Sequence, residues 1–267
     1  MNASDTAIDS VLRISIGRHV SAAASDYVRE KIVPVLDNGF GPVLGARIRL
    51  TGHPDPAVAR PIVAQANVDT NGRGVRVQVA AATTREAVDL LAARLKTRME
   101  RLSRHRAALR DGRRGLRGHE WRHGDGSRIW LTSVPRESDQ REVVRRKSYA
   151  LIDETCDEAI FDMELMDYEF HLFTESGSGV DSVMYRTADA EYLLAQVNPH
   201  PESVIRGAIT YTISGSAAPT LDIGAAVDRL ELTGWPFVFF CDRDSNRGSV
   251  LYHRYDGDYG LITPPTR

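Results

Sequence analysis

Two stretches of the chain repeat one pattern. Residues 161–173, FDMELMDYEFHLF, and 183–196, VMYRTADAEYLLAQ, correspond to 228–240, DRLELTGWPFVFF, and 250–263, VLYHRYDGDYGLIT. The full blocks, 155–196 and 222–263, align without gaps at a constant offset of 67. Because two copies are too few for a solenoid, the repeat predicts a small domain present in tandem. Identical residues in the alignment include Ala159 and Ala226, Glu164 and Glu231, Leu165 and Leu232, Phe170 and Phe237, Phe173 and Phe240, Val183 and Val250, Tyr185 and Tyr252, Asp189 and Asp256, Tyr192 and Tyr259, and Leu194 and Leu261.

Each copy is expected to fold as a small βαβββ domain. Thr155 with Glu158 predicts a capping box, while Asp222 and Gly234 predict the start and the end of the matching helix. Asp189 and Asp256 are interpreted as turn residues. The expected elements are 143–151, 155–167, 169–174, 181–187 and 191–196 in the first copy, and 205–213, 223–233, 236–242, 248–254 and 259–263 in the second.

The N-terminal part is expected to be a compact α+β domain. Alternating apolar residues predict strands at 12–16 and 45–51, and Asn71-Gly72 predicts a hairpin between strands 62–69 and 74–81. Helices are expected at 22–37 and from the Thr83–Glu86 capping box onward. The predicted order is βαβββα, with two helices on one face of a four-stranded sheet.

Charge separates the two halves of the chain. Residues 1–142 hold 24 Lys and Arg against 16 Asp and Glu, whereas residues 143–267 hold 10 against 20. Within 94–122 the balance is 11 basic to 3 acidic residues, and Arg94, Arg98, Arg101 and His105 form a ridge at helical spacing. This asymmetry indicates a polyanionic partner for the N-terminal half. The alternative is a charged helix that is merely solvated.

Residues 108–142 have the composition of a basic linker, with the run RDGRRGLRGHEWRHGDG at 110–126. His119 and His123 lie four residues apart, but a third ligand is missing and the glycines disfavour a helix, so no metal site is expected. Trp121 and Trp130 could stack on bases or pack on a neighbouring domain. The predicted division is domain 10–107, linker 108–142, first repeat domain 143–198 and second repeat domain 204–265.

Several classes of protein are not indicated by the sequence. No phosphate-binding loop, nucleophile motif or clustered Cys and His set is present, so neither an enzyme nor a cofactor is expected. Cys156 and Cys241 are isolated and are interpreted as small buried residues of a reduced protein. Without an apolar run of roughly 18 residues or a signal peptide, a cytoplasmic location is expected.

The residues above carry a resemblance to a known family. Both repeats resemble the C-terminal domain of long-form bacterial ribosome hibernation-promoting factors, whose ending is close to V-x-Y-x-R-x-D-G-x-Y-G-L-I-x-P. The first copy departs from it, with Ala190 and Leu193 in place of glycines. The tandem duplication is also similar to the dormancy- or hypoxia-associated factors of the mycobacterial type. The second copy keeps Tyr252, Asp256, Gly257, Tyr259, Gly260, Leu261, Ile262 and Pro264.

The N-terminal half is similar to the ribosome-binding domain of the same family. ISIGRHVS at 14–21 places Arg18 at the family's arginine, and Arg94, Arg98 and Arg101 fall where its helix has Lys, Gln and Lys. The resemblance implies a protein that responds to stress and occupies the tRNA and mRNA channel of the small subunit, near the decoding region of 16S rRNA. Double-helical RNA is read by shape, so no base-reading motif is required. The residues expected to contact rRNA are Arg18, His19, Arg29, Lys31, Arg85, Arg94, Lys96, Arg98, Arg101, Arg104 and Arg106.

Pairing of the repeat domains is the second implication. A domain of about fifty residues buries little surface by itself, and in the family single C-terminal domains are understood to pair and link two ribosomes. Here a tethered partner favours pairing within one chain, hence a monomer that silences single ribosomes. Alternatives are pairing between chains, which makes a ribosome-dimerising factor, a general RNA chaperone, and an enzyme using His119 and His123. The expected pairing residues are Phe170, Phe173, Tyr185, Tyr192, Phe237, Phe239, Tyr252 and Tyr259.

Overall fold

The computed structural model describes residues 8, 10–38, 41–53, 58–70, 73–110, 141–148, 150–187, 189–254 and 257–265. These residues form two compact units. The first contains the residues up to 110 and the segment 164–167, and the second contains most of the chain from residue 141 on. The predicted turn at Asn71-Gly72, the His119–His123 pair and most of the predicted linker lie outside the described residues.

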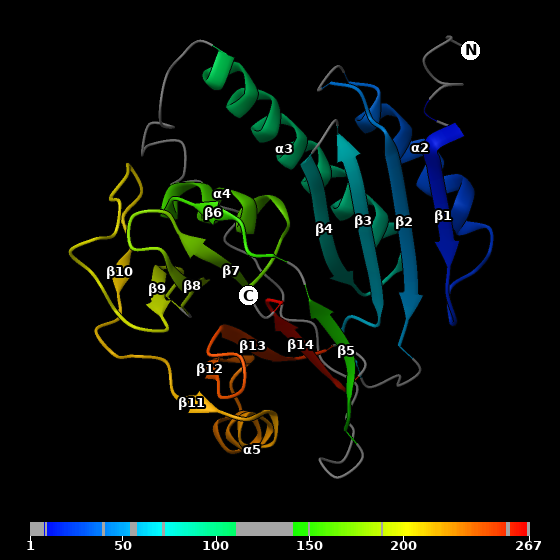
Figure 1. Ribbon diagram of the computed structural model, residues 1–267. Helices are drawn as coiled ribbons and strands as arrows, with labels where there is room; N and C mark the ends of the chain where they lie inside the picture. The colour runs from blue at the N-terminus through cyan, green and yellow to red at the C-terminus, as the bar shows by residue number, and fades with distance from the viewer. Residues whose placement is uncertain are drawn as a thin grey trace. The chain divides into compact units, whose positions relative to one another are not determined.

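The first unit is built on one four-stranded sheet in the order β1-β2-β3-β4. Strand β1 (Leu12–Ile16) runs parallel to β2 (Gly45–Gly52), which pairs antiparallel with β3 (Ile62–Thr70), as β3 does with β4 (Arg73–Ala81). Helices α2 (Ala24–Leu36) and α3 (Thr84–Arg110) lie on one face of this sheet (Figure 1). The α+β prediction for this half is confirmed.

Periodicity explains why these segments form these elements. Ala46, Ile48 and Leu50 alternate along β2 and are buried, because successive side chains of a strand point to opposite faces. Val28 and Ile32 of α2 are fully buried, as are Val88, Leu91, Leu95 and Met99 of α3, which recur every three or four residues. Helix α3 starts at the predicted cap, where the Thr83 Oγ1 accepts a hydrogen bond of 3.2 Å from the Glu86 N–H.

The second unit holds two repeats with the same order of elements. The first repeat consists of β6 (Asp153–Glu154), α4 (Cys156–Leu165), β7 (Phe170–Glu175), β8 (Val180–Arg186) and β9 (Tyr192–Gln196). The second consists of β11 (Thr220–Leu221), α5 (Ile223–Thr233), β12 (Phe237–Asp242), β13 (Gly248–His253) and β14 (Tyr259–Thr263). The element boundaries of the two repeats agree within one residue at the offset of 67.

The leading strands of the two repeats are exchanged. Strand β5 (Val143–Ser148) precedes the first repeat but pairs with β14 of the second, with Arg145 opposite Gly260. Strand β10 (Thr212–Ile213) precedes the second repeat but pairs with β9 of the first, with Thr212 opposite Leu193. The two sheets therefore have the orders β10-β9-β8-β7-β6 and β11-β12-β13-β14-β5. The sequence pattern indicated these strands, but it assigned each of them to its own copy.

Hydrogen bonds along the connecting segments accompany the exchange. The Arg141 Nη1 lies 2.7 Å from the Glu231 Oε1, which holds the start of β5 on the second repeat. The Asp157 carboxylate of the first repeat accepts bonds of 2.7 and 3.3 Å from the Ala208 and Ile209 N–H groups, which lead into β10. These contacts help to hold each leading strand on the sheet of the other repeat.

The predicted helix caps of both repeats are present. The Glu158 N–H donates to the Thr155 Oγ1 at 3.4 Å, and the Asp222 Oδ1 accepts a bond of 2.9 Å from the Ala225 N–H. Gly234 ends α5 with φ of 62°. Cys156 and Cys241 are buried, as expected. Among the described residues, no helix is long and apolar enough to cross a membrane.

Candidate nucleic-acid interface and repeat interface

Two of the predicted rRNA contacts lie in the turn between β1 and α2. Arg18 and His19 are exposed there, and His19 adopts a positive φ of 62°. The Gly52 N–H donates a hydrogen bond of 2.9 Å to the Arg18 carbonyl, which ties the turn to the end of β2. The backbone that carries these two side chains is thereby held at one end of the sheet.

A second group of basic residues surrounds Tyr27, between α2 and α3. The Tyr27 hydroxyl donates to the Asp89 Oδ1 at 2.7 Å, which joins the two helices. The Arg85 guanidinium lies 4.5 Å from the centroid of the Tyr27 ring, and the Lys31 Nζ lies 5.2 Å from the same centroid. Hydrogen bonding to Glu30, 3.3 Å away, raises the pKa of Lys31. Both cations gain from the negative face of the ring, and Arg85 is exposed.

The remaining predicted residues divide by exposure. The Arg94 Nη1 donates to the Gln78 carbonyl at 3.2 Å, and Arg106 donates to the carbonyl and the hydroxyl of Thr70, so both arginines tie α3 to the sheet. Lys31, Arg94, Arg98, Arg101 and Arg106 are partly or fully covered. The exposed members of the predicted set are Arg18, His19, Arg29, Arg85, Lys96 and Arg104. Contact of any of them with RNA stays a prediction.

An apolar cluster joins the two repeats, here called the inter-repeat cluster. Its centre is the pair Phe170 and Phe237, whose ring centroids are 4.7 Å apart. Phe170 also lies 5.7 Å from the ring of Tyr252, and Phe237 lies 5.4 Å from the ring of Tyr185. These two contacts are equivalent at the offset of 67, which gives the pair an approximate two-fold symmetry. The cluster further contains Leu172, Val183, Ala195, Phe239, Val250 and Ile262.

Three of the eight predicted pairing residues lie elsewhere. Phe173 is fully buried in the core of the first repeat, where Tyr192 packs as well, and Tyr259 is buried in the core of the second. The cause is strand geometry, because residues three apart, such as Phe170 and Phe173, point to opposite faces of a sheet. The inter-repeat cluster therefore contains Phe170, Tyr185, Phe237, Phe239 and Tyr252 from the predicted set.

A polar contact beside this cluster was missed by the sequence reasoning. The Arg247 Nε and Nη2 donate to the Asp181 Oδ2 and Oδ1 at 2.7 and 3.1 Å, and the Gly248 N–H donates to the same Oδ2 at 2.9 Å. Hydrogen bonding to Asp181 raises the pKa of Arg247. A signal for it was present in the repeat alignment, where Asp181 corresponds to Gly248 and Val180 to Arg247.

Glu231 of α5 is the centre of a second polar group. The Tyr259 hydroxyl donates to the Glu231 Oε1 at 2.6 Å, and the Arg141 Nη1 donates to the same oxygen at 2.7 Å. Burial raises the pKa of Glu231, but these two hydrogen bonds outweigh it and hold the pKa below its usual value. Burial, followed by the hydrogen bond to Glu231, raises the pKa of Tyr259 to about 12.

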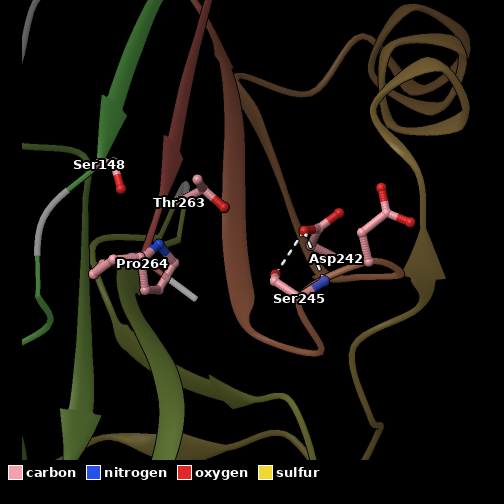
Figure 2. Close-up of a pocket in the computed structure, with 7 residues that line it drawn as sticks. Ser148, Asp242, Ser245, Thr263 and Pro264 are labelled. Atoms are coloured by element: carbon pink, nitrogen blue, oxygen red, sulfur yellow. Dashed lines mark hydrogen bonds between the residues drawn. The ribbon is translucent and has the colours of Figure 1, made fainter. Parts of the chain in front are cut away.

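A shallow hollow lies at the end of the second sheet (Figure 2). Ser148, Thr263 and Pro264 form one side, and Asp242 on the other accepts hydrogen bonds of 2.6 and 3.3 Å from the Ser245 hydroxyl and N–H. The Asp242 carboxylate is therefore engaged with its own loop. Within the part of the chain that the structure describes, no group of three His, Cys, Asp or Glu side chains is placed to hold a metal ion.

The two repeats are similar to known proteins. Residues 138–194 and 216–261 both match the family described as Sigma 54 modulation/S30EA ribosomal protein C terminus. The chain is 41% identical over 129 residues to the dormancy associated translation inhibitor of Mycobacterium tuberculosis. That match covers 46% of this chain and 47% of the relative, so the chain spans about half of that relative's length. The ribosome hibernation promotion factor of the same organism is 37% identical over 71 residues, or 26% of this chain and 32% of that relative.

Two solved structures overlap with part of the chain. The N-terminal domain of Thermus thermophilus Protein Y shares 27% identity and covers 34% of this chain and 96% of its own, with a TM-score of 0.28. A ribosomal subunit interface protein from Coxiella burnetii shares 23% identity over 36% of this chain and 97% of its own, with a TM-score of 0.27. TM-scores this low carry no argument about the fold, which therefore rests on the strands and helices described above. In both of its C-terminal repeats the chain is similar to the S30EA ribosomal protein C-terminal domain, which confirms the resemblance found in the sequence.

Proposed function

We propose that this protein is a ribosome hibernation factor of the cytoplasm. It binds the small-subunit channel used by tRNA and mRNA, blocks translation, and protects inactive ribosomes during stress or dormancy. The observation that carries this proposal is the pair of repeats similar to the S30EA C-terminal domain, together with relatives named as a dormancy associated translation inhibitor and a ribosome hibernation promotion factor.

The N-terminal α+β domain supplies the RNA-binding surface in this proposal. Arg18, Arg29, Arg85, Lys96 and Arg104 are exposed cations that can neutralise phosphates along an rRNA groove. Such binding depends on shape and charge rather than on base edges. Inhibition is then steric, because the bound domain occupies space that tRNA and mRNA require, and it needs neither turnover nor a cofactor.

The paired repeats keep the protein on single ribosomes in this proposal. The inter-repeat cluster and the exchanged strands support pairing within one chain. A repeat that already has its partner in cis is not free to bind a repeat on another ribosome, because the tethered partner is present at a far higher effective concentration.

The test is sedimentation of purified ribosomes in sucrose gradients, with and without the protein, at two salt concentrations. Co-migration with single ribosomes is expected. A ribosome-dimer peak would show that the repeats pair between chains. Equal affinity for naked RNA would favour an RNA chaperone, and protein that stays at the top of the gradient at low salt would refute ribosome binding.

Variants of α3 sharpen this test. Lys96→Ala/Arg104→Ala removes two exposed cations, whereas Arg229→Ala removes an exposed cation from α5 as the matched control. Each lost phosphate contact is expected to reduce the slope of log affinity against log salt by roughly 0.7–0.9. The control should leave the slope unchanged, and an α3 variant that also leaves it unchanged would place the RNA contact elsewhere.

A further inference from the structure

The approximate two-fold symmetry places residue 181 directly against residue 248. The Gly248 N–H reaches the Asp181 Oδ2 at 2.9 Å, and these two residues occupy the same position of the repeat. A Cβ atom added to Gly248 would lie 2.8 Å from the Asp181 Cβ, a separation that Cβ atoms essentially never show. The repeats therefore approach so closely here that one of the two facing residues has to be a glycine.

The charges at this point match only between unlike repeats. Asp181 and Arg247 are 9% and 15% exposed, so little water remains to solvate either one alone. The first repeat carries Val180 and Asp181 where the second carries Arg247 and Gly248. Each repeat thus contributes one half of a bidentate ion pair, and neither repeat contains both halves.

The apolar side chains of the inter-repeat cluster are also unequal in size. Leu172 of the first repeat corresponds to Phe239 of the second, and Ala195 corresponds to Ile262. Leu151 is larger than its counterpart Ala218, so the difference runs in the opposite direction at this position. The two faces therefore differ in shape, and two copies of either face would leave space at some positions and overpack others, both of which cost stability.

We propose that Val180–Asp181 and Arg247–Gly248 form a pairing-specificity element that admits unlike repeats and rejects like ones. In the structure the occupant of the first repeat's face is the second repeat of the same chain. This inference rests on the cis-pairing part of the proposed function and is independent of the ribosome. Specificity arises from the penalty on the wrong pairs as well as from the contacts of the right one.

The penalty on like pairs follows from the same geometry. If two first repeats paired, their two Asp181 carboxylates would have to share a space that now accommodates one. Second repeat against second repeat would remove the carboxylate that pairs with Arg247 and leave a largely buried guanidinium without its counterion. Loss of one partner from a buried ion pair is strongly destabilising.

Three full-length variants test the element. Arg247→Val/Gly248→Asp gives both repeats the face of the first, and Val180→Arg/Asp181→Gly gives both the face of the second. The variant with all four changes exchanges the two faces. Arg243→Val is the matched control, since it removes an exposed ion pair with Asp222 outside the contact.

The first readout is the melting temperature of the repeat unit. Both like-faced variants are expected to melt roughly 10 °C below the wild type. The exchanged variant is expected to recover most of that loss, and the control to show none. The proposal is overturned if the exchanged variant is as unstable as the like-faced variants, or if the like-faced variants are as stable as the wild type. If one like-faced variant fails to fold, the other still decides the outcome.

The second readout is mass by light scattering. An equimolar mixture of the two like-faced variants should form a heterodimer of about 59 kDa, twice the 29.6 kDa of one chain, and neither variant should do so alone. A mixture without heterodimer contradicts the proposal, and a wild-type dimer overturns the assignment of the partner to the same chain. Neither readout involves ribosomes, so a protein that fails to bind ribosomes in the sedimentation test leaves these results intact.

Discussion

The contact between Phe170 and Phe237 provides a quantitative test of pairing within one chain. Their centroid separation of 4.7 Å lies in the range where aromatic pairs contribute about 0.5–1.5 kcal/mol beyond area burial. A fully buried Phe→Ala change costs about 3–5 kcal/mol, and because both rings are partly exposed we expect about 2 kcal/mol for each single variant. The double variant should cost less than the sum of the two by the coupling energy.

The assay is urea unfolding of the full chain for the wild type, Phe170→Ala, Phe237→Ala and the double variant. Amide hydrogen exchange in β7 and β12 reports on the repeats and leaves out the N-terminal domain. Trp235→Ala is the control, since this neighbouring aromatic is 53% exposed and its loss should change stability by less than about 0.5 kcal/mol. Measurements at two protein concentrations about tenfold apart complete the design.

Two results would refute the reasoning. Additivity of the single variants within roughly 0.3 kcal/mol would mean that the two rings do not interact. A wild-type midpoint that rises with protein concentration would mean that the repeats pair between chains, because only an intermolecular contact depends on concentration.

Three further predictions concern the second unit. Gly234 ends α5 at φ of 62°, so Gly234→Ala should lower the free energy of unfolding by about 1 kcal/mol in urea titrations, whereas no loss would contradict the left-handed cap. Glu231 has a depressed pKa, so its contribution to stability is present above its unfolded pKa near 4.5 and is lost as the pH falls through the lower folded value. Glu231→Gln should therefore weaken the fall of the melting temperature at acid pH, and an unchanged acid dependence would contradict this prediction. Burial raises the pKa of Cys156 to about 11 and also raises that of Cys241, so neither thiol should react with an aromatic disulfide reagent at about pH 8 until urea is added; rapid reaction of native protein would contradict their burial.

Most elements were predictable because their signals are local. The side chains that the period of each segment places on the core face are buried, as predicted: Ala46, Ile48 and Leu50 in a strand and Leu91 and Leu95 in a helix. The predicted caps at Thr155 and Asp222 both form, since a cap depends on residues only three positions away. The aromatic contact of Phe170 with Phe237 was also anticipated, although Phe173, Tyr192 and Tyr259 lie in the cores of their own repeats.

The sequence by itself determined the two repeats and the βαβββα domain, because periodicity and caps depend on residues close together in the chain. Only the tertiary structure decided which sheet receives each leading strand. Strand β5 pairs with β14 of the second repeat, and the Arg141–Glu231 contact lies beside this pairing. Only the tertiary structure, likewise, brought Asp181 against Arg247 and Gly248, because a contact across a pseudo-two-fold axis depends on how two faces meet, and its one trace in the sequence is the unequal residues at 180–181 and 247–248.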